Sequence, residues 1–265
     1  MFNIKNRLAR RYNSYISQQT CPIQKRHDDL YLVSYPKSGV TWLSCLLAYL
    51  GLRLSNDNRE VTVFNVQDYV PDIHVSRYIN LDSQMPGLGF RVIKSHSYFN
   101  PDYKKVIYLV RDPRDVIISY WYYLSTLGQY HGSLSDLLRA PEFGVDAWSR
   151  HVRGWLEETP PSTMINFIRY EDLKARPQFV LKHLLSLFGL YNQDELIDCA
   201  LDALSFENMR NSEIEYSSFN PTIPSDHAFM RKGKSGGWRE EISESDLRFV
   251  ENICGNLMSK FNYGY

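Results

Sequence analysis

The sequence predicts a single α/β domain in which helices flank a central parallel β-sheet. Four short runs are rich in Val, Ile and Tyr and are mostly continuously apolar, as in parallel strands that are covered on both faces. They are residues 30–35, 91–96, 105–111 and 164–170. Helical patterns follow three of these runs, and strands that alternate with helices form parallel sheets. No linker divides the chain, so we expect one domain over residues 29–265 after a lead-in segment over residues 1–28.

Periodicity and end signals place the helices. Apolar residues recur at helical spacing over residues 42–50, and Gly51 follows as a stop signal. Asp112 can cap a second helix, and Pro113 can occupy its first position. Residues 177–190 form a third amphipathic pattern with Pro near its start and Gly near its end. Each predicted helix therefore follows a predicted strand.

The stretch 212–237 differs from these segments because it is polar, contains two prolines and several glycines, and shows no period. A long loop inside a compact domain is often a functional lid. We therefore expect residues 212–237 to form a loop that closes over a site.

Composition and charge exclude several classes of protein. The 30 basic and 30 acidic side chains give a formal net charge of zero, which argues against a surface built to grip nucleic acid. The four cysteines are widely spaced and form no CxxC pair, which argues against a metal cluster or a disulfide framework. The first 20 residues are basic but lack a continuous apolar core, so we expect neither a signal peptide nor an anchor. A cytoplasmic protein is predicted; a weak basic helix on a membrane surface is the alternative for the lead-in.

The stretch "YPKSGVTW" (35–42) has the composition of a phosphate-binding loop. A strand that turns into a helix through small residues offers free backbone N–H groups and the positive end of a helix dipole. Lys37 adds a mobile charge and Ser38 adds a hydroxyl. The usual P-loop has the order Gly-Lys-Ser/Thr, whereas Lys37 here precedes Ser38 and Gly39, which weakens an ATPase or GTPase interpretation. Taken alone, the loop could also be a surface turn without a ligand.

Five stretches, in the right order, resemble motifs of the sulfotransferases that use 3′-phosphoadenosine 5′-phosphosulfate (PAPS). The loop just described is similar to their 5′-phosphosulfate loop, and "VIYLVRDPRDVIISYW" (106–121) to their 3′-phosphate segment. The others are "IKSHS" (93–97), "RYEDLKARP" (169–177) and "RKGKSGGW" (231–238). The resemblance spans roughly residues 30 to 240. It implies a P-loop-like sheet and transfer of a sulfuryl group from PAPS to a hydroxyl or amine, leaving 3′-phosphoadenosine 5′-phosphate (PAP).

The resemblance also implies a set of nucleotide-binding residues. Those expected at the 5′ end of the donor are Lys37, Ser38, Gly39, Val40, Thr41 and Trp42. Those expected at its 3′-phosphate are Arg111, Ser119, Arg231, Lys232 and Gly233. Tyr170 and Phe206 are expected to flank the adenine, as is Trp42. Structural alternatives stay open: the first arginine could pair with a neighbouring aspartate, the serine could be a surface residue, and the aromatics could pack in the core.

The resemblance assigns the chemistry to three residues. His96 is the expected general base, and a histidine at a strand end can accept a proton near neutrality. Lys37 and Lys94 are expected to stabilise the charge on the leaving phosphate. The helix "WSRHVRGWLEE" resembles one beside the acceptor pocket, so Trp148 and His151 are candidates for acceptor contact, or else for packing in an amphipathic helix.

The sequence departs from the family pattern in places. Val40 and Ser95 each stand where the family more often has a threonine. The residues "SYF" replace the usual Leu-Pro after His96, and Gly237 replaces a common aspartate. The change after His96 puts the shape of the acceptor pocket in doubt rather than the chemistry. For the glycine we have no mechanistic account.

Two rival functions remain open at this point. A P-loop-type nucleotide kinase would need the Gly-Lys-Ser/Thr order and an acidic residue that ends a strand to hold Mg²⁺, and the sequence has neither clearly. A non-catalytic PAPS- or PAP-binding module is disfavoured because Lys37, Lys94 and His96 are all intact.

The acceptor is not determined by the sequence. Its 19 tyrosines, 13 phenylalanines and 5 tryptophans could line a pocket for a phenol, an alcohol or a peptide, or stack on sugar rings. We expect a small-molecule or glycan acceptor, no nucleic-acid partner and no metal, since protein cations do the neutralising. The oligomeric state is open because the family's dimerisation motif is not evident near the C-terminus. The segment "VPDIH" (70–74) resembles one in bacterial members.

Overall fold

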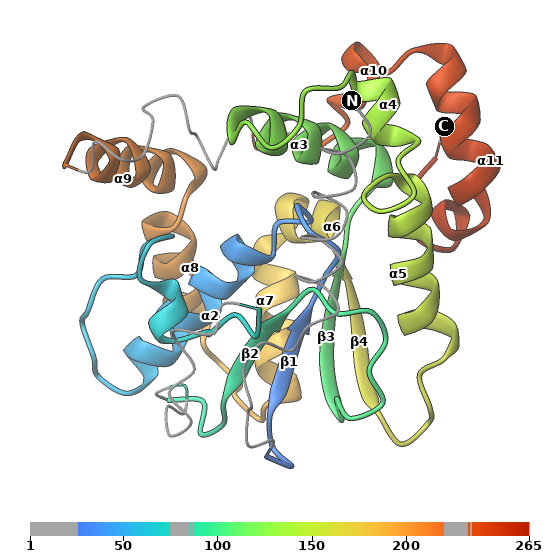
Figure 1. The fold of residues 1–265 in the computed structure, drawn as a ribbon. Coiled ribbons are helices and arrows are strands. Elements are labelled where there is room, and N and C mark those ends of the chain that lie inside the picture. The colour runs from blue at the N-terminus through green and yellow to red at the C-terminus, as the bar shows by residue number, and fades with distance from the viewer. Residues whose placement is uncertain (1–25, 75–84, 86, 220–232, 234, 265) are drawn as a thin grey trace.

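The structure is a computed structural model that describes residues 26–74, 85, 87–219, 233 and 235–264. Its centre is a four-stranded sheet with the order β2-β1-β3-β4, in which every neighbouring pair is parallel (Figure 1). The strands are β1 (Leu30–Val33), β2 (Val92–Ser95), β3 (Lys105–Val110) and β4 (Met164–Arg169). The predicted parallel sheet and all four of its strands are confirmed.

Eleven further elements surround the sheet in the described residues, and one of them is a short 3₁₀ helix, η1 (Val66–Asp68). The α-helices are α2 (Val40–Leu54), α3 (Pro113–Thr126), α4 (Leu134–Leu138), α5 (Val145–Glu157), α6 (Tyr170–Ala175), α7 (Pro177–Leu187), α8 (Asp194–Ala203), α9 (Phe206–Phe219), α10 (Trp238–Glu241) and α11 (Glu244–Lys260). None of the described helices is both long enough and apolar enough to cross a bilayer.

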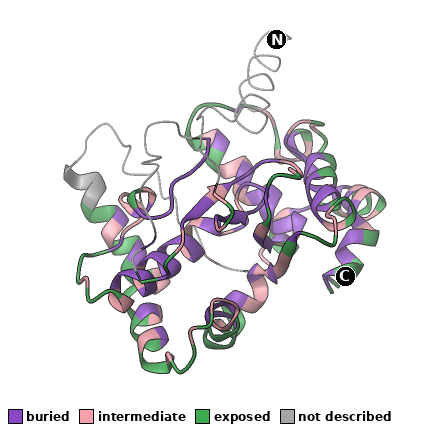
Figure 2. Cartoon of the chain, turned by 90° about the horizontal axis from the view of Figure 1, so that it is seen from below, coloured by how far each residue is buried: buried purple, intermediate pink, exposed green. Residues whose placement is uncertain are grey.

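The two faces of the sheet are covered by different helices. Successive side chains of a strand point to opposite faces, and in β1 they enter two different clusters. Tyr31 and Val33 pack with residues of α3, α4, α5 and α11. Leu30 and Leu32 pack with residues of α2, α7 and α8. Buried residues accordingly concentrate in the strands and in the helix faces turned towards them (Figure 2).

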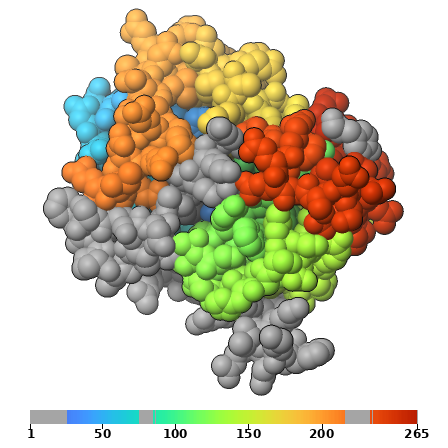
Figure 3. Space-filling view, turned by 90° about the horizontal axis from the view of Figure 1, so that it is seen from above, coloured from blue at the N-terminus to red at the C-terminus, as the bar shows by residue number. Residues whose placement is uncertain are grey.

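The parallel register brings all four carboxyl ends to one edge of the sheet. Val33 of β1 lies opposite Ser95 of β2 and Tyr108 of β3, so the residues that follow these strands are neighbours in space. Seen from above this edge, segments far apart in the sequence meet: α8 and α9 (orange), α3 (green), and α10 with α11 (red) (Figure 3). Ligands bind at this edge in open α/β sheets.

One prediction about the loops is wrong in part. The stretch 212–237 was expected to be a loop throughout, but α9 continues to Phe219. Met209 and Glu213 are buried one helical turn apart, which holds the helix against the body of the protein despite its polar composition. The first proline of the stretch is Pro221, so nothing in residues 212–219 breaks a helix. Residues 220–232 and 234, and with them most of the predicted lid, lie outside the described residues, as does most of the predicted lead-in segment.

Candidate functional site at the carboxyl edge of the sheet

The loop between β1 and α2 has a shape that only certain residues allow. Lys37 and Gly39 both adopt positive φ, 68° and 93°. A Cβ atom on Gly39 would lie 2.5 Å from the ring of Tyr170, so a side chain there is excluded both by conformation and by space. Gly39 is the N-cap of α2 and no side chain caps that end. The first N–H groups of the helix, at Val40 and Thr41, are therefore available to an anion.

Ser38 gives the loop a further open donor. Its side-chain oxygen is buried and has no hydrogen-bond partner among the described residues. A buried hydroxyl without a partner costs free energy unless a ligand supplies one. The loop is thus shaped and polarised to receive a negatively charged group.

Residues from three strand ends meet around this loop. Arg111, after β3, donates through Nη1 to the Lys37 carbonyl at 3.1 Å. Its guanidinium carbon lies 4.5 Å from the ring centroid of Tyr170, the residue after β4. Trp42 meets Tyr170 edge-on with centroids 6.4 Å apart and donates from its indole to the Leu204 carbonyl at 3.0 Å. Four residues predicted to hold one nucleotide are therefore in contact with one another.

The structure brings Gly233 to Phe206. A Cβ on Gly233, which has a φ of 55°, would lie 2.4 Å from the Phe206 ring, so its backbone rests directly on that ring. The ammonium of Lys174 also lies over this ring, 5.5 Å from its centroid. Ser119 is half-buried on α3. The other two predicted 3′-phosphate ligands, Arg231 and Lys232, lie outside the described residues.

Lys37 is the centre of a cluster of positive charge. Burial, together with the nearby charges of Lys94 and Arg111, lowers its pKa to about 7, and the Glu213 carboxylate opposes this shift. Its ammonium lies 4.0 Å from the ring centroid of Tyr123 on α3. The positive charges of Lys94 and Arg111 beside Lys37 favour a negatively charged ligand at this place.

His96 is held in a defined orientation just beyond β2. Its Nδ1 lies 2.8 Å from the Ser34 carbonyl. A carbonyl can only accept, so Nδ1 carries the proton and Nε2 carries the lone pair. Burial and the charge of Lys94 lower the pKa of His96 to about 3, and Asp72 opposes them. The imidazole is therefore neutral at physiological pH, in the protonation state that a general base requires.

Two residues that the sequence did not single out support this strand end. Asp72 pairs with Lys94, with 3.0 Å between the carboxylate and the ammonium. His74 accepts at Nε2 a hydrogen bond of 3.0 Å from the backbone N–H of His96. Both residues lie in the segment "VPDIH", which resembles one in bacterial members of the family. Its alternation of Asp and His, which puts both on one side of an extended backbone, was the signal that could have found them.

The comparisons with known proteins agree with this arrangement. The family model described as the sulfotransferase domain matches residues 27–262. The chain belongs to the sulfotransferase family. Sulfotransferase 1E1 of Bos taurus is 28% identical over 93% of this chain and 91% of its own length. Sulfotransferase 2A1 of Rattus norvegicus is 27% identical over 90% of this chain and 87% of its own.

Solved structures share the fold. A mouse sulfotransferase complexed with PAP superposes with a TM-score of 0.66 at 22% identity, covering 93% of this chain and 87% of that chain. A retinol dehydratase in complex with androsterone and inactive cofactor PAP superposes with a TM-score of 0.69 at 19% identity, covering 94% of this chain and 85% of that chain. At these identities the likeness establishes the common α/β fold of the sulfotransferases.

Helix α5 of this sulfotransferase packs against the strand end that carries His96. Trp148 and His151 were candidates for acceptor contact, but both side chains are 0% exposed. His151 lies between the Tyr108 hydroxyl, 2.7 Å from Nδ1, and the His96 carbonyl, 3.1 Å from Nε2. Trp148 belongs to the hydrophobic core between the sheet and α3, α4, α5 and α11. These contacts favour the packing alternative, because the two buried side chains support the strand end that carries His96. Contact of either residue with the acceptor stays a prediction.

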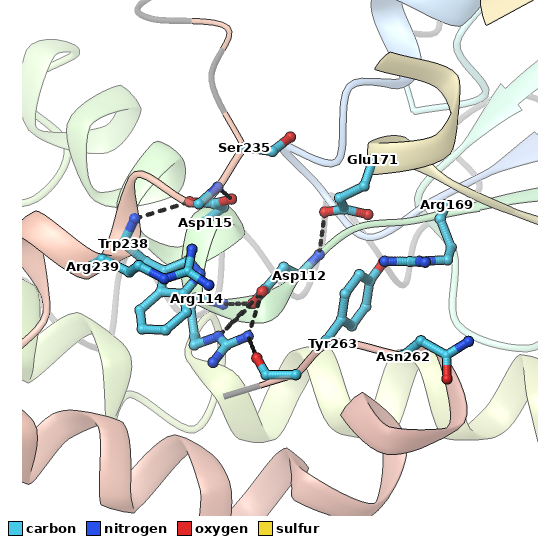
Figure 4. Close-up of a pocket in the computed structure, with 12 residues that line it drawn as sticks. Asp112, Arg114, Asp115, Arg169, Glu171, Ser235, Trp238, Arg239, Asn262 and Tyr263 are labelled. Atoms are coloured by element: carbon cyan, nitrogen blue, oxygen red, sulfur yellow. Dashed lines mark hydrogen bonds and ion pairs between the residues drawn. The ribbon is translucent and has the colours of Figure 1, made fainter. Parts of the chain in front are cut away.

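A hollow lies beside the first turn of α3 (Figure 4). It has a volume of about 240 Å³ and is lined by residues including Asp112, Asp115, Glu171, Trp238 and Tyr263. Asp115 accepts from the backbone N–H of Gly236 at 2.7 Å and of Trp238 at 3.2 Å. In this sulfotransferase Asp115 thus anchors the chain that follows Gly233, one of the predicted 3′-phosphate ligands.

Proposed function

We propose that this protein transfers the sulfuryl group of PAPS to a hydroxyl, or an amine, of a small-molecule acceptor and leaves PAP as the product. One observation carries the proposal: a neutral imidazole with its lone pair fixed on Nε2 stands beside a cluster of cations at the carboxyl edge of the sheet. Membership of the sulfotransferase family supports it. The PAP complexes of proteins with the same fold support it as well.

The donor would be held in three places. The N–H groups at the start of α2 and the hydroxyl of Ser38 suit the 5′ end, where the loop presents open donors. Arg111, Ser119 and the segment 231–233 are assigned to the 3′-phosphate, for which a planar guanidinium can provide two parallel hydrogen bonds. The rings of Trp42, Tyr170 and Phe206 are assigned to the adenine, and a ring stacked on a base contributes on the order of 1–3 kcal/mol.

The donor supplies an activated sulfuryl group, and its departure leaves additional negative charge on the 5′-phosphate. Lys37 and Lys94 are assigned to stabilise that charge. His96 accepts the proton of the acceptor hydroxyl at Nε2, because Nδ1 already donates to Ser34. The lowered pKa of the imidazole favours an unprotonated Nε2 at physiological pH.

The first test is a calorimetric titration with PAP, ATP and 5′-AMP, each with and without Mg²⁺. We expect micromolar or tighter binding of PAP that does not depend on Mg²⁺ and is much stronger than binding of ATP. A preference for ATP with Mg²⁺ would instead support the kinase interpretation. An acceptor screen with PAPS as donor then tests turnover; tight binding of PAP with no turnover on any acceptor would support a non-catalytic module.

Two variants test the assigned roles. His96→Ala should abolish turnover while PAP affinity changes less than about twofold, because the imidazole acts on the acceptor. Arg111→Ala should weaken binding of PAP far more than binding of 5′-AMP, since only the former carries a 3′-phosphate. Equal losses for both nucleotides would contradict the role of Arg111.

A further inference from the structure

The segment that ends in His74 runs alongside the strand that carries the proposed catalytic residues. The backbone N–H of Lys94 donates to the Pro71 carbonyl at 2.9 Å, and the N–H of Ile73 donates to the Lys94 carbonyl at 3.0 Å. Asp72 and Lys94 form a parallel bridge. This pairing extends the sheet beyond β2 by a single position and fixes the register of the two segments.

The register places each residue of one segment against its counterpart on the other. Asp72, 1% exposed, holds the Lys94 ammonium at 3.0 Å. The rings of His74 and His96 lie nearly parallel, at 17°, with centroids 6.2 Å apart. His74 also accepts the backbone N–H of His96 at Nε2. Asp72 and His74 are themselves linked, because Asp72 Oδ1 accepts the backbone N–H of His74 at 3.0 Å.

We propose that Asp72 and His74 are positioning residues for sulfuryl transfer, Asp72 acting through Lys94 and His74 acting through the backbone of His96. The inference rests on the roles proposed above for Lys94 and His96. Neither residue is assigned contact with donor or acceptor.

Asp72 fixes both the place and the electrostatic effect of Lys94. A lysine side chain has four rotatable carbons and a compact charge, and a buried carboxylate 3.0 Å away limits where that charge can lie. The groups that act on the imidazole of His96 are Lys94 and His74, which lower its pKa, and Asp72 and the Ser34 carbonyl, which raise it. Without the carboxylate, the charge of Lys94 would make His96 a weaker base.

His74 fixes the base from the other side. Because its Nε2 accepts a hydrogen bond, this nitrogen is unprotonated and the ring is held as one tautomer. The bond holds the His96 backbone where Nδ1 reaches the Ser34 carbonyl. His151 contacts the carbonyl of the same residue. The backbone of His96 is thereby held at both its N–H and its C=O. Removal of the His74 imidazole should therefore turn the His96 ring rather than unfold the site.

Steady-state kinetics with matched variants test the positioning roles. We expect His74→Leu to lower kcat about 10- to 100-fold with PAP affinity within about twofold, as for loss of catalytic geometry. His74→Gln keeps an acceptor near the position of Nε2 and should recover kcat to within about threefold of the wild type. Asp72→Asn should lower kcat about tenfold, because it removes the charge and keeps the shape. Asp68→Asn and His183→Leu, at exposed positions, are the controls and should leave kcat unchanged.

A second measurement separates this inference from the proposed function. Nitrogen chemical shifts of the histidine side chains in the full-length protein, assigned with His96→Gln, report the tautomer and pKa of His96 whether or not an acceptor is known. In the wild type we expect His96 to be protonated at Nδ1. In His74→Leu we expect a mixture of the two His96 tautomers, and in Asp72→Asn we expect a pKa of His96 below that of the wild type.

The outcomes distinguish the two ideas. If the wild type binds PAP but transfers no sulfuryl group, while the histidine shifts change as expected, the proposed function fails and the positioning roles stand. If the wild type is active, and both variants keep their kcat and their His96 shifts, the positioning roles are overturned and the proposed function stands. A fall in kcat that His74→Gln does not recover, with unaltered His96 shifts, also overturns the role of His74.

Discussion

The two lysines at the carboxyl edge of the sheet, Lys37 and Lys94, lie in opposite electrostatic surroundings. Lys37 stands in a strained loop among other cations, and its pKa falls to about 7. Lys94 stands at the end of a regular strand with a buried carboxylate 3.0 Å from its ammonium. The first is a charge whose pKa is lowered by burial and by neighbouring cations; the second is a charge held next to a buried carboxylate.

The difference shows how one site can both attract an anion and control where charge lies. Like charges around Lys37 raise the free energy of the donor-free site, and an arriving phosphate relieves it. Lys94 is already paired with Asp72, so the pair also fixes where its charge lies beside His96 before the leaving phosphate develops charge. Binding and positioning are therefore assigned to different strand ends.

The sharpest test of this comparison is to remove each lysine in turn. Lys37→Ala should lower kcat by a factor on the order of 10²–10³, because a cation aimed at developing charge is lost, and should leave the free energy of unfolding unchanged or slightly higher. Lys94→Ala should lower the free energy of unfolding by about 3 kcal/mol, because it leaves Asp72 buried without its partner. Urea unfolding and steady-state kinetics measure both quantities. Equal destabilisation by the two variants would contradict the comparison.

The next effect concerns the shape of the Lys37 loop. Gly39→Ala should lower the free energy of unfolding by about 2–3 kcal/mol and weaken PAP binding, because the methyl group would meet the Tyr170 ring. Gly128→Ala is the matched control: its φ is also positive, at 62°, but a methyl group there meets nothing within 4 Å. Gly128→Ala should lower the free energy of unfolding by about 1 kcal/mol, because only the positive φ disfavours a side chain there. If the two variants unfold alike, the packing of Gly39 against Tyr170 is not important.

At the other strand end, the buried imidazole of His96 makes stability depend on pH. His96 has a pKa of about 3 in the folded protein and about 6.5 when unfolded. Below pH 6.5 the unfolded chain therefore binds the additional proton, and stability is lost as the pH falls. Between pH 7 and pH 5 this contributes about 2 kcal/mol. His96→Asn should flatten the pH dependence by that amount in urea unfolding at the two pH values, whereas His183→Asn, on the surface, should not.

The smallest effect is a proton taken up on binding. Above pH 7 part of Lys37 is neutral in the free protein, and a bound phosphate restores its charge. PAP binding at pH 8 should take up a fraction of a proton, and affinity should decline as the pH rises from 7 to 9. Calorimetry in buffers of different ionisation enthalpy measures the uptake. Uptake that persists in Lys37→Ala would assign the proton to another group.

The strands and the motif residues could be predicted because their signals are local. The β1 loop carries its function in a few consecutive residues, and Gly39, Arg111 and Tyr170 each directly follow or closely follow a strand. Parallel pairing then has to bring those positions to one edge. The helix over residues 212–219 was missed because its support comes from buried contacts of Met209 and Glu213 and not from an apolar period.

What the sequence by itself determined is which residues stand at the strand ends: the Lys37 loop, His96 and the cations that are proposed to act with them. What only the tertiary structure decided is how each of these groups is held. The partner of Lys94 lies on another segment, His96 takes its tautomer from the Ser34 carbonyl 62 residues away, and His151 is buried against the His96 carbonyl. The physical reason is that protonation state and orientation depend on burial and on hydrogen bonds between distant residues, which exist only once the chain has folded.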